Sequence, residues 1–165
     1  MTPTGTTAAV GIGELAVSGD PAATLAALGL GSCVAVIAHD GTAGIGGMLH
    51  VMLPSSVGDR SGNLTRYADT GIAELLEEMT TRGANVRRAA IWLVGGAAVL
   101  RPSGQNQQQF RVGQRNMDAT QSVLAKRGLR VRAADLGGTK GRTVELDVGT
   151  GRVLVRTLGE APREL

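Results

Sequence analysis

Residues 31–53 read GSCVAVIAHDGTAGIGGMLHVML, and this stretch decides the fold. Two apolar runs flank the dipeptide Asp40-Gly41, which is a strong signal for a β-hairpin turn because glycine takes the positive φ that such turns need. The pattern predicts two antiparallel strands, over residues 33–38 and 43–53. Pro54 is expected to end the second strand, because proline has no N–H to donate to a sheet.

Further elements are predicted on both sides of this hairpin. Short apolar runs predict strands at residues 10–17, 25–30, 89–94, 129–133, 143–148 and 152–158. Apolar side chains at helical spacing predict a helix around residues 72–79, with Gly83 as its C-terminal cap. Residues 105–109 are expected to form a loop, and Asn116 to cap a second helix that ends at Gly128. Many strands with two main helices predict an α+β fold, a layered sandwich.

Composition limits the class of protein. The chain has 165 residues with 42% hydrophobic and 19% charged side chains, as expected for one globular domain spanning residues 1–165. A lone cysteine cannot form an internal disulfide, and neither a secretion signal nor a membrane span is visible, so we expect a cytoplasmic protein without membrane insertion. The net charge of +3 raises nucleic acid as a partner, but one Trp, one Tyr and one Phe give no stacking platform. We expect no nucleic-acid binding and no cofactor.

Cys33 and His50 each have a plain structural explanation when taken alone. A free cysteine is commonly a small buried hydrophobe, and its neighbours are apolar. A histidine in a strand can be a core residue bonded to a carbonyl. The two residues gain a different meaning only if the hairpin brings them together.

Hairpin geometry predicts that they share one face of the sheet. A two-residue turn at Asp40-Gly41 would place Cys33 opposite Met48 and Gly31 opposite His50. Cys33 and His50 are then diagonal neighbours, about 7–8 Å apart at the backbone. A four-residue loop preserves this parity, whereas a three-residue loop would put the two side chains on opposite faces.

A neighbouring cysteine and histidine can carry out nucleophilic catalysis. The histidine takes the thiol proton, and the resulting thiolate attacks an amide carbonyl. The glycine-containing segments Gly31-Ser32 and Gly46-Gly47 precede the two residues and would let a substrate approach, or aim N–H groups at an oxyanion. A bulged or bent strand explains these glycines equally well.

A metal site is the alternative for the same residues. Cys33, His39, Asp40 and His50 have suitable ligand types. We expect His39 to point away from the face of Cys33, and therefore predict no metal.

Two segments resemble the signature segments of the CheD family of chemoreceptor glutamine deamidases. They are GLGSCVAV at residues 29–36 and GGMLHVMLP at residues 46–54, and the likeness extends over about residues 25–158. Shorter matches are Tyr67-Ala68-Asp69, Gly95-Gly96-Ala97, VGQRN at residues 112–116, DLGG at residues 135–138 and Gly141-Arg142.

The resemblance implies a function and a fold. It implies that Cys33 is the nucleophile and His50 the base of an enzyme that hydrolyses chemoreceptor glutamines to glutamate and ammonia through a thioester. It also implies an α/β/β sandwich like that of the cytotoxic necrotizing toxin deamidases. The partners implied are the cytoplasmic helices of methyl-accepting chemoreceptors and a CheC-type phosphatase.

One position departs from the family pattern. The family has a threonine six positions before the cysteine, where it orients the histidine, and here that position is Ala27. A main-chain carbonyl fills the third place in the related toxins, and the carbonyl of Ala27 could do so here. The alternative is a catalytically impaired adaptor that binds receptor or a CheC-type phosphatase.

Overall fold

The structure is a computed structural model that describes residues 5–99 and 106–165, and its strands form two five-stranded mixed sheets. The first sheet has the order β1 (Thr7–Ala9), β3 (Thr24–Leu30), β8 (Arg142–Asp147), β9 (Val153–Thr157) and β10 (Arg163–Glu164). The second has the order β2 (Leu15–Ser18), β5 (Ile45–Val51), β4 (Val34–Asp40), β6 (Ala90–Gly95) and β7 (Ala133–Leu136). The helices are η1 (Leu64–Arg66), α1 (Ala68–Thr81) and α2 (Asn106–Lys126).

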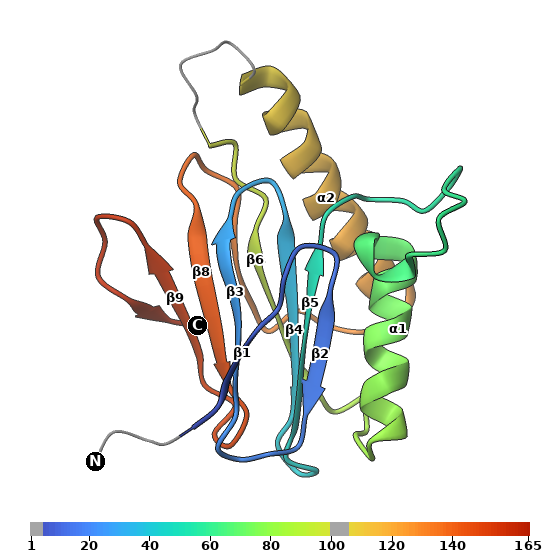
Figure 1. Cartoon of the computed structure of the whole chain (residues 1–165), viewed down its shortest axis with the longest axis vertical. Helices are drawn as coiled ribbons and strands as arrows, with labels where there is room; N and C mark the ends of the chain where they lie inside the picture. The colour runs from blue at the N-terminus through green and yellow to red at the C-terminus, as the bar shows by residue number, and fades with distance from the viewer. Residues whose placement is uncertain (1–4, 100–105) are drawn as a thin grey trace.

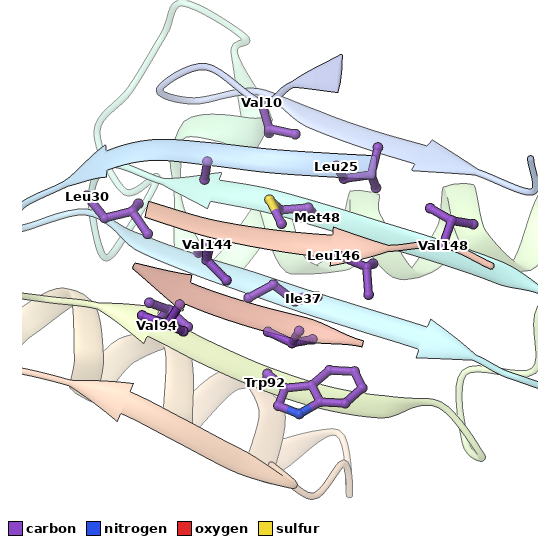
Figure 2. Packing of buried hydrophobic residues seen from close by; sticks show 14 of the residues in the cluster. Val10, Leu25, Leu30, Ile37, Met48, Trp92, Val94, Val144, Leu146 and Val148 are labelled. Atoms are coloured by element: carbon purple, nitrogen blue, oxygen red, sulfur yellow. The ribbon is translucent and has the colours of Figure 1, made fainter. Parts of the chain in front are cut away.

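The two sheets and the helices form three layers, which confirms the predicted layered α+β fold (Figure 1). One apolar cluster lies between the sheets, and Figure 2 shows Ile37, Met48 and Trp92 of the second sheet with Val144 and Leu146 of the first. Another cluster joins the outer face of the second sheet to the helices; its members include Val36, Leu49, Ile72, Leu75 and Leu124. The second sheet is therefore buried on both faces, which explains why β4 and β5 are almost wholly apolar.

The central hairpin forms, but with a wider loop than the predicted two-residue turn. Asp40 pairs with Ile45, so the loop has four residues, and His50 lies opposite Ala35 rather than opposite Gly31. The Asp40 carboxylate accepts the N–H groups of Thr42 and Ala43, which stabilises the wider loop. The parity is that of the predicted pairing, because the loop is longer by an even number of residues.

The chain crosses between the sheets three times at one end of the sandwich, and residues 137–141, which join β7 to β8, make one of these crossings (Figure 1). Residues 10–14 join β1 to β2, and residues 31–33 join β3 to β4. The prediction of one strand over residues 10–17 is therefore wrong at its start. Gly13 has a φ of 74°, which glycine adopts readily, and this conformation ends any extended strand before β2.

The second helix is also longer than predicted. Residues 106–109 are helical rather than looped, and Asn116 lies in the middle of α2 instead of at its start; Gln105 lies outside the described residues. The strand predicted at residues 129–133 begins only at Ala133. None of the helices that the structure describes has the length and hydropathy needed to cross a membrane.

Candidate active site

Cys33 lies directly before β4, at the point where the chain enters the second sheet. Its side chain is half-buried and packs against the apolar cluster between the sheets. Its carbonyl accepts a hydrogen bond of 2.8 Å from the N–H of Gly96. Gly95 can lie this close only without a side chain, since a Cβ there would come within 2.2 Å of the Cys33 carbonyl oxygen. Burial raises the pKa of the thiol, so Cys33 is a neutral thiol at rest.

His50 lies near the end of β5. On the side away from β4, its backbone forms hydrogen bonds with the segment just before β2. Its N–H donates to the carbonyl of Glu14 over 2.9 Å, and its carbonyl accepts from Gly13 over 2.9 Å. The side chain is only 3% exposed. Burial lowers the pKa of the imidazole, while a hydrogen bond to Val10 and the charge of Glu14 act in the opposite direction. The ring is therefore neutral at physiological pH.

The Val10 carbonyl fixes which ring nitrogen can act as a base. His50 Nδ1 lies 3.0 Å from the carbonyl oxygen of Val10. A carbonyl oxygen only accepts, so Nδ1 must carry the proton and Nε2 keeps its lone pair. Val10 is itself held by its N–H, which donates to the carbonyl of Ala26 over 2.7 Å. The imidazole is thus oriented by the segment that crosses between the sheets.

The two side chains lie on the same face of the second sheet. Ala35 pairs with His50 and belongs to the apolar cluster between the sheets. Cys33, which precedes Ala35 by two residues, packs against the same cluster. Cys33 and His50 are diagonal neighbours in this register, and such neighbours are about 7–8 Å apart at the backbone. An imidazole can span that separation, so the arrangement suits proton transfer from Sγ to Nε2.

The carbonyl expected to orient His50 is not the one that does so. Ala27 is fully buried in β3 and pairs with Val144, while the hydrogen bond to the His50 ring comes from Val10. The prediction that the Ala27 carbonyl fills the third place is therefore corrected. Val10 takes this role because residues 10–14 wrap around the end of β5.

The four residues predicted for substrate approach divide into two pairs. Gly31 and Ser32 are half-buried beside Cys33, and the Gly31 carbonyl accepts the N–H of Ala97 over 2.8 Å. Gly46 and Gly47 are buried near the other end of β5. A Cβ on Gly46 would come within 2.8 Å of Leu146, and one on Gly47 equally close to Leu75. Close packing therefore explains why residues 46 and 47 are glycines, and we assign this pair no part in substrate approach.

His39 lies on the same face as Cys33, which corrects the expectation that it points away. Six residues separate the two, an even number, and the His39 ring bonds to Val148 of the opposite sheet. The distance along the strand is about 20 Å, from roughly 3.3 Å per residue. Asp40 is held at that same far end by Arg88. Separation along the strand, and not orientation, keeps His39 away from Cys33 and His50, whereas Asp40 also points to the opposite face of the sheet.

Comparisons with known proteins show which family the chain belongs to. The family model described as CheD chemotactic sensory transduction matches residues 52–157. A protein from Symbiobacterium thermophilum named probable chemoreceptor glutamine deamidase CheD is 43% identical over 95% of this chain and 96% of its own length. The chain belongs to the CheD family. The chemoreceptor glutamine deamidase CheD of Thermotoga maritima is 41% identical over 91% of each chain.

Two residues that contact the candidate site were not predicted from the sequence. Val10 acts through its main-chain carbonyl, which any residue type would provide, so no local signal exists. Asn116 donates to the carbonyls of Ser32 and Met52, beside the candidate nucleophile and base. The available signal is its place within the VGQRN segment that carries the family resemblance, although the local sequence predicts a helix cap at this position.

Proposed function

We propose that this protein is a cysteine-dependent glutamine deamidase that acts on the cytoplasmic part of methyl-accepting chemoreceptors. The observation that carries the proposal is the pairing of His50 opposite Ala35, which sets a carbonyl-bound imidazole diagonally beside the thiol of Cys33. The names of relatives that are about 40% identical over nearly the whole chain support the substrate.

The first half of the reaction forms a thioester. Nε2 of His50 takes the proton from Cys33, and the thiolate attacks the side-chain carbonyl carbon of a glutamine. A carbon–sulfur bond forms, and the carbon–nitrogen bond then breaks as the protonated His50 gives its proton to the leaving nitrogen, which departs as ammonia. Positioned acid–base assistance of this kind contributes about 10²–10⁴ in rate.

The second half restores the enzyme. His50 takes a proton from a water molecule whose oxygen attacks the thioester carbon. The carbon–sulfur bond breaks, the cysteine sulfur regains its proton from His50, and the product is glutamate. Neutral resting forms of both groups suit this cycle, because a neutral imidazole accepts a proton and a neutral thiol has one to give.

Val10 completes the site as its orienting group. By holding Nδ1, its carbonyl keeps the lone pair of Nε2 available and stabilises the imidazolium that forms after proton transfer. This hydrogen bond removes the main reason to regard the chain as an impaired adaptor, which was that Ala27 has no side-chain oxygen.

The test is deamidation of a purified cytoplasmic chemoreceptor fragment, followed by peptide mass mapping and ammonia release. Wild-type protein is expected to convert specific glutamines to glutamate. Cys33→Ala is expected to lose this activity by about 10⁴-fold or more, as when the nucleophile of a catalytic triad is removed. If both proteins bind the fragment and leave its glutamines intact, the enzyme proposal is wrong and the adaptor function takes its place.

A CheC-type phosphatase, if it binds the same face, is expected to inhibit the reaction competitively.

A further inference from the structure

Strands β4 and β5 stop pairing beside Cys33, one pair beyond the pair that contains His50. Val34 and Val51 form the last pair of the hairpin register. Beyond it, the N–H groups of Met52 and Leu53 both donate to the carbonyl of Arg66 instead of to β4. Backbone pairing therefore does not fix the distance between the two strand ends at Ser32, next to Cys33, and at Met52, two residues past His50.

A single side chain spans this gap. The amide nitrogen of Asn116 donates 2.9 Å to the carbonyl of Ser32 and 3.0 Å to the carbonyl of Met52. Ser32 adjoins the candidate nucleophile, and Met52 follows His50 by two residues. One planar amide thus takes the place of the missing strand-to-strand hydrogen bonds.

Close contact between α2 and the end of β6 holds Asn116 in this position. A Cβ on Gly113 would come within 2.7 Å of the Gly96 carbonyl oxygen, and one on Gly96 within 2.4 Å of Met117. The helix can lie this near only because both positions are glycine. Asn116 is fully buried as a result, and Thr120 one turn later donates to its carbonyl over 2.6 Å.

Stability alone does not account for an asparagine here. Its Oδ1 is buried and accepts no hydrogen bond from the described part of the chain. An unpaired buried acceptor offsets much of what the two donated bonds contribute to stability. Exchanging Oδ1 and Nδ2 would be worse, because Oδ1 would then face two carbonyl oxygens. Polar groups of this kind favour one specific geometry over net stability.

We propose that Asn116 is a positioning residue, which fixes the separation of Cys33 and His50 by linking Ser32 to Met52. This inference rests on the proposed function, since it assumes that the thiol and the imidazole act together. Loss of the link lets the two strand ends move apart, and misplacement by about 1 Å can cost roughly 10²-fold in rate.

The test compares Asn116→Leu, which is nearly isosteric but cannot donate, with Thr120→Val as the matched control. Thr120 is equally buried on the same helix, and among the described residues its hydroxyl bonds within α2. Asn116→Ala is the second variant, because it removes the amide without requiring space for a leucine. Each folded variant is assayed for kcat and KM on the receptor fragment. The alkylation rate of Cys33 by iodoacetamide is also measured from pH 5 to 10; as the only cysteine, Cys33 gives an unambiguous signal.

The expected result is a fall in kcat of about 10²-fold for both Asn116 variants with KM unchanged, since the chemistry and not the binding surface is disturbed. Their alkylation profiles should approach that of His50→Gln, whereas Thr120→Val keeps the wild-type profile and kcat. Wild-type kcat and profile in the Asn116 variants would overturn the proposal, as would an equal loss of kcat in Thr120→Val.

The alkylation profile separates this failure from failure of the proposed function. If wild type and His50→Gln have the same profile, the thiol and imidazole are not coupled, and both proposals are wrong. If these two differ while the Asn116 variants match the wild type, only the positioning role is overturned.

Discussion

The two ends of the β4–β5 hairpin each hold a buried histidine whose ring bonds to a main-chain carbonyl. At one end His50 Nδ1 meets Val10, and at the other His39 Nε2 lies 2.8 Å from the carbonyl of Val148. The bonds are of the same type, and both join segments of the two sheets. The difference lies in the neighbours, since His50 has a thiol beside it and His39 has Gly151 against its ring. A carbonyl-bound histidine can therefore act as a base only where a proton donor lies close to its free ring nitrogen.

The largest effect expected from this comparison is on activity. His50→Gln should lower kcat/KM for receptor deamidation by about 10²–10⁴-fold, because no group then takes the thiol proton. His39→Leu should leave kcat/KM unchanged but lower the free energy of unfolding by about 1–2 kcal/mol, since the Val148 carbonyl loses its donor. Deamidation rates and urea titrations of the two variants check this. Comparable activity losses in both would show that the ends are not functionally distinct.

For Asp40, beside His39, we expect a large loss of stability without a loss of activity. The buried carboxylate accepts from Arg88 Nε over 2.8 Å and from the N–H of Asn85 over 2.7 Å. Asp40→Ala should lower the free energy of unfolding by about 3 kcal/mol, near the lower end for a broken buried pair because Arg88 is half-exposed. Activity of the folded fraction should not change. Urea unfolding and deamidation at low temperature measure the two quantities, and a matching fall in kcat would contradict the assignment.

The pH dependence of this stability has a definite sign. The Arg88 guanidinium holds the pKa of Asp40 well below its usual range. A depressed folded-state pKa contributes stability above the unfolded value of about 4, and the contribution is lost as pH falls toward the folded value. The wild-type protein should therefore lose this increment below about pH 4, whereas Asp40→Ala has none to lose.

The ends also differ in how well the sequence predicted them. The alternation of β4 and β5 predicted that Cys33 and His50 share a face, because parity survives any even change in loop length. The loop length itself was wrong, since Asp40 accepts two loop N–H groups and favours a four-residue loop. The Val10 carbonyl was unpredictable, because its position depends on where the chain crosses between sheets. The helix around Asn116 was placed too late because a polar, glutamine-rich start resembles a loop.

The pH profile of activity tests the resting state of the candidate site. Burial lowers the pKa of His50, so the imidazole stays neutral as pH falls through its ordinary value of about 6.5. The value of kcat/KM should therefore hold at pH 6.5 and decline by about tenfold per unit only at lower pH. Initial deamidation rates at low substrate concentration measure this. An acidic limb centred above pH 6.5 would contradict a lowered pKa of His50.

The smallest effect is expected at Ala27, where a threonine would restore the family pattern. Ala27 is fully buried between the sheets, in the same apolar cluster as Val10. A threonine hydroxyl there would compete for a nitrogen that Val10 already holds, so kcat/KM should change by less than about threefold. The added hydroxyl and methyl should cost about 1–2 kcal/mol of stability, because the site is packed and apolar. Deamidation kinetics with a urea titration separate the two effects. A gain in kcat well above threefold would show that the Val10 carbonyl orients His50 poorly, and that the end with the thiol is held less firmly than the end with His39.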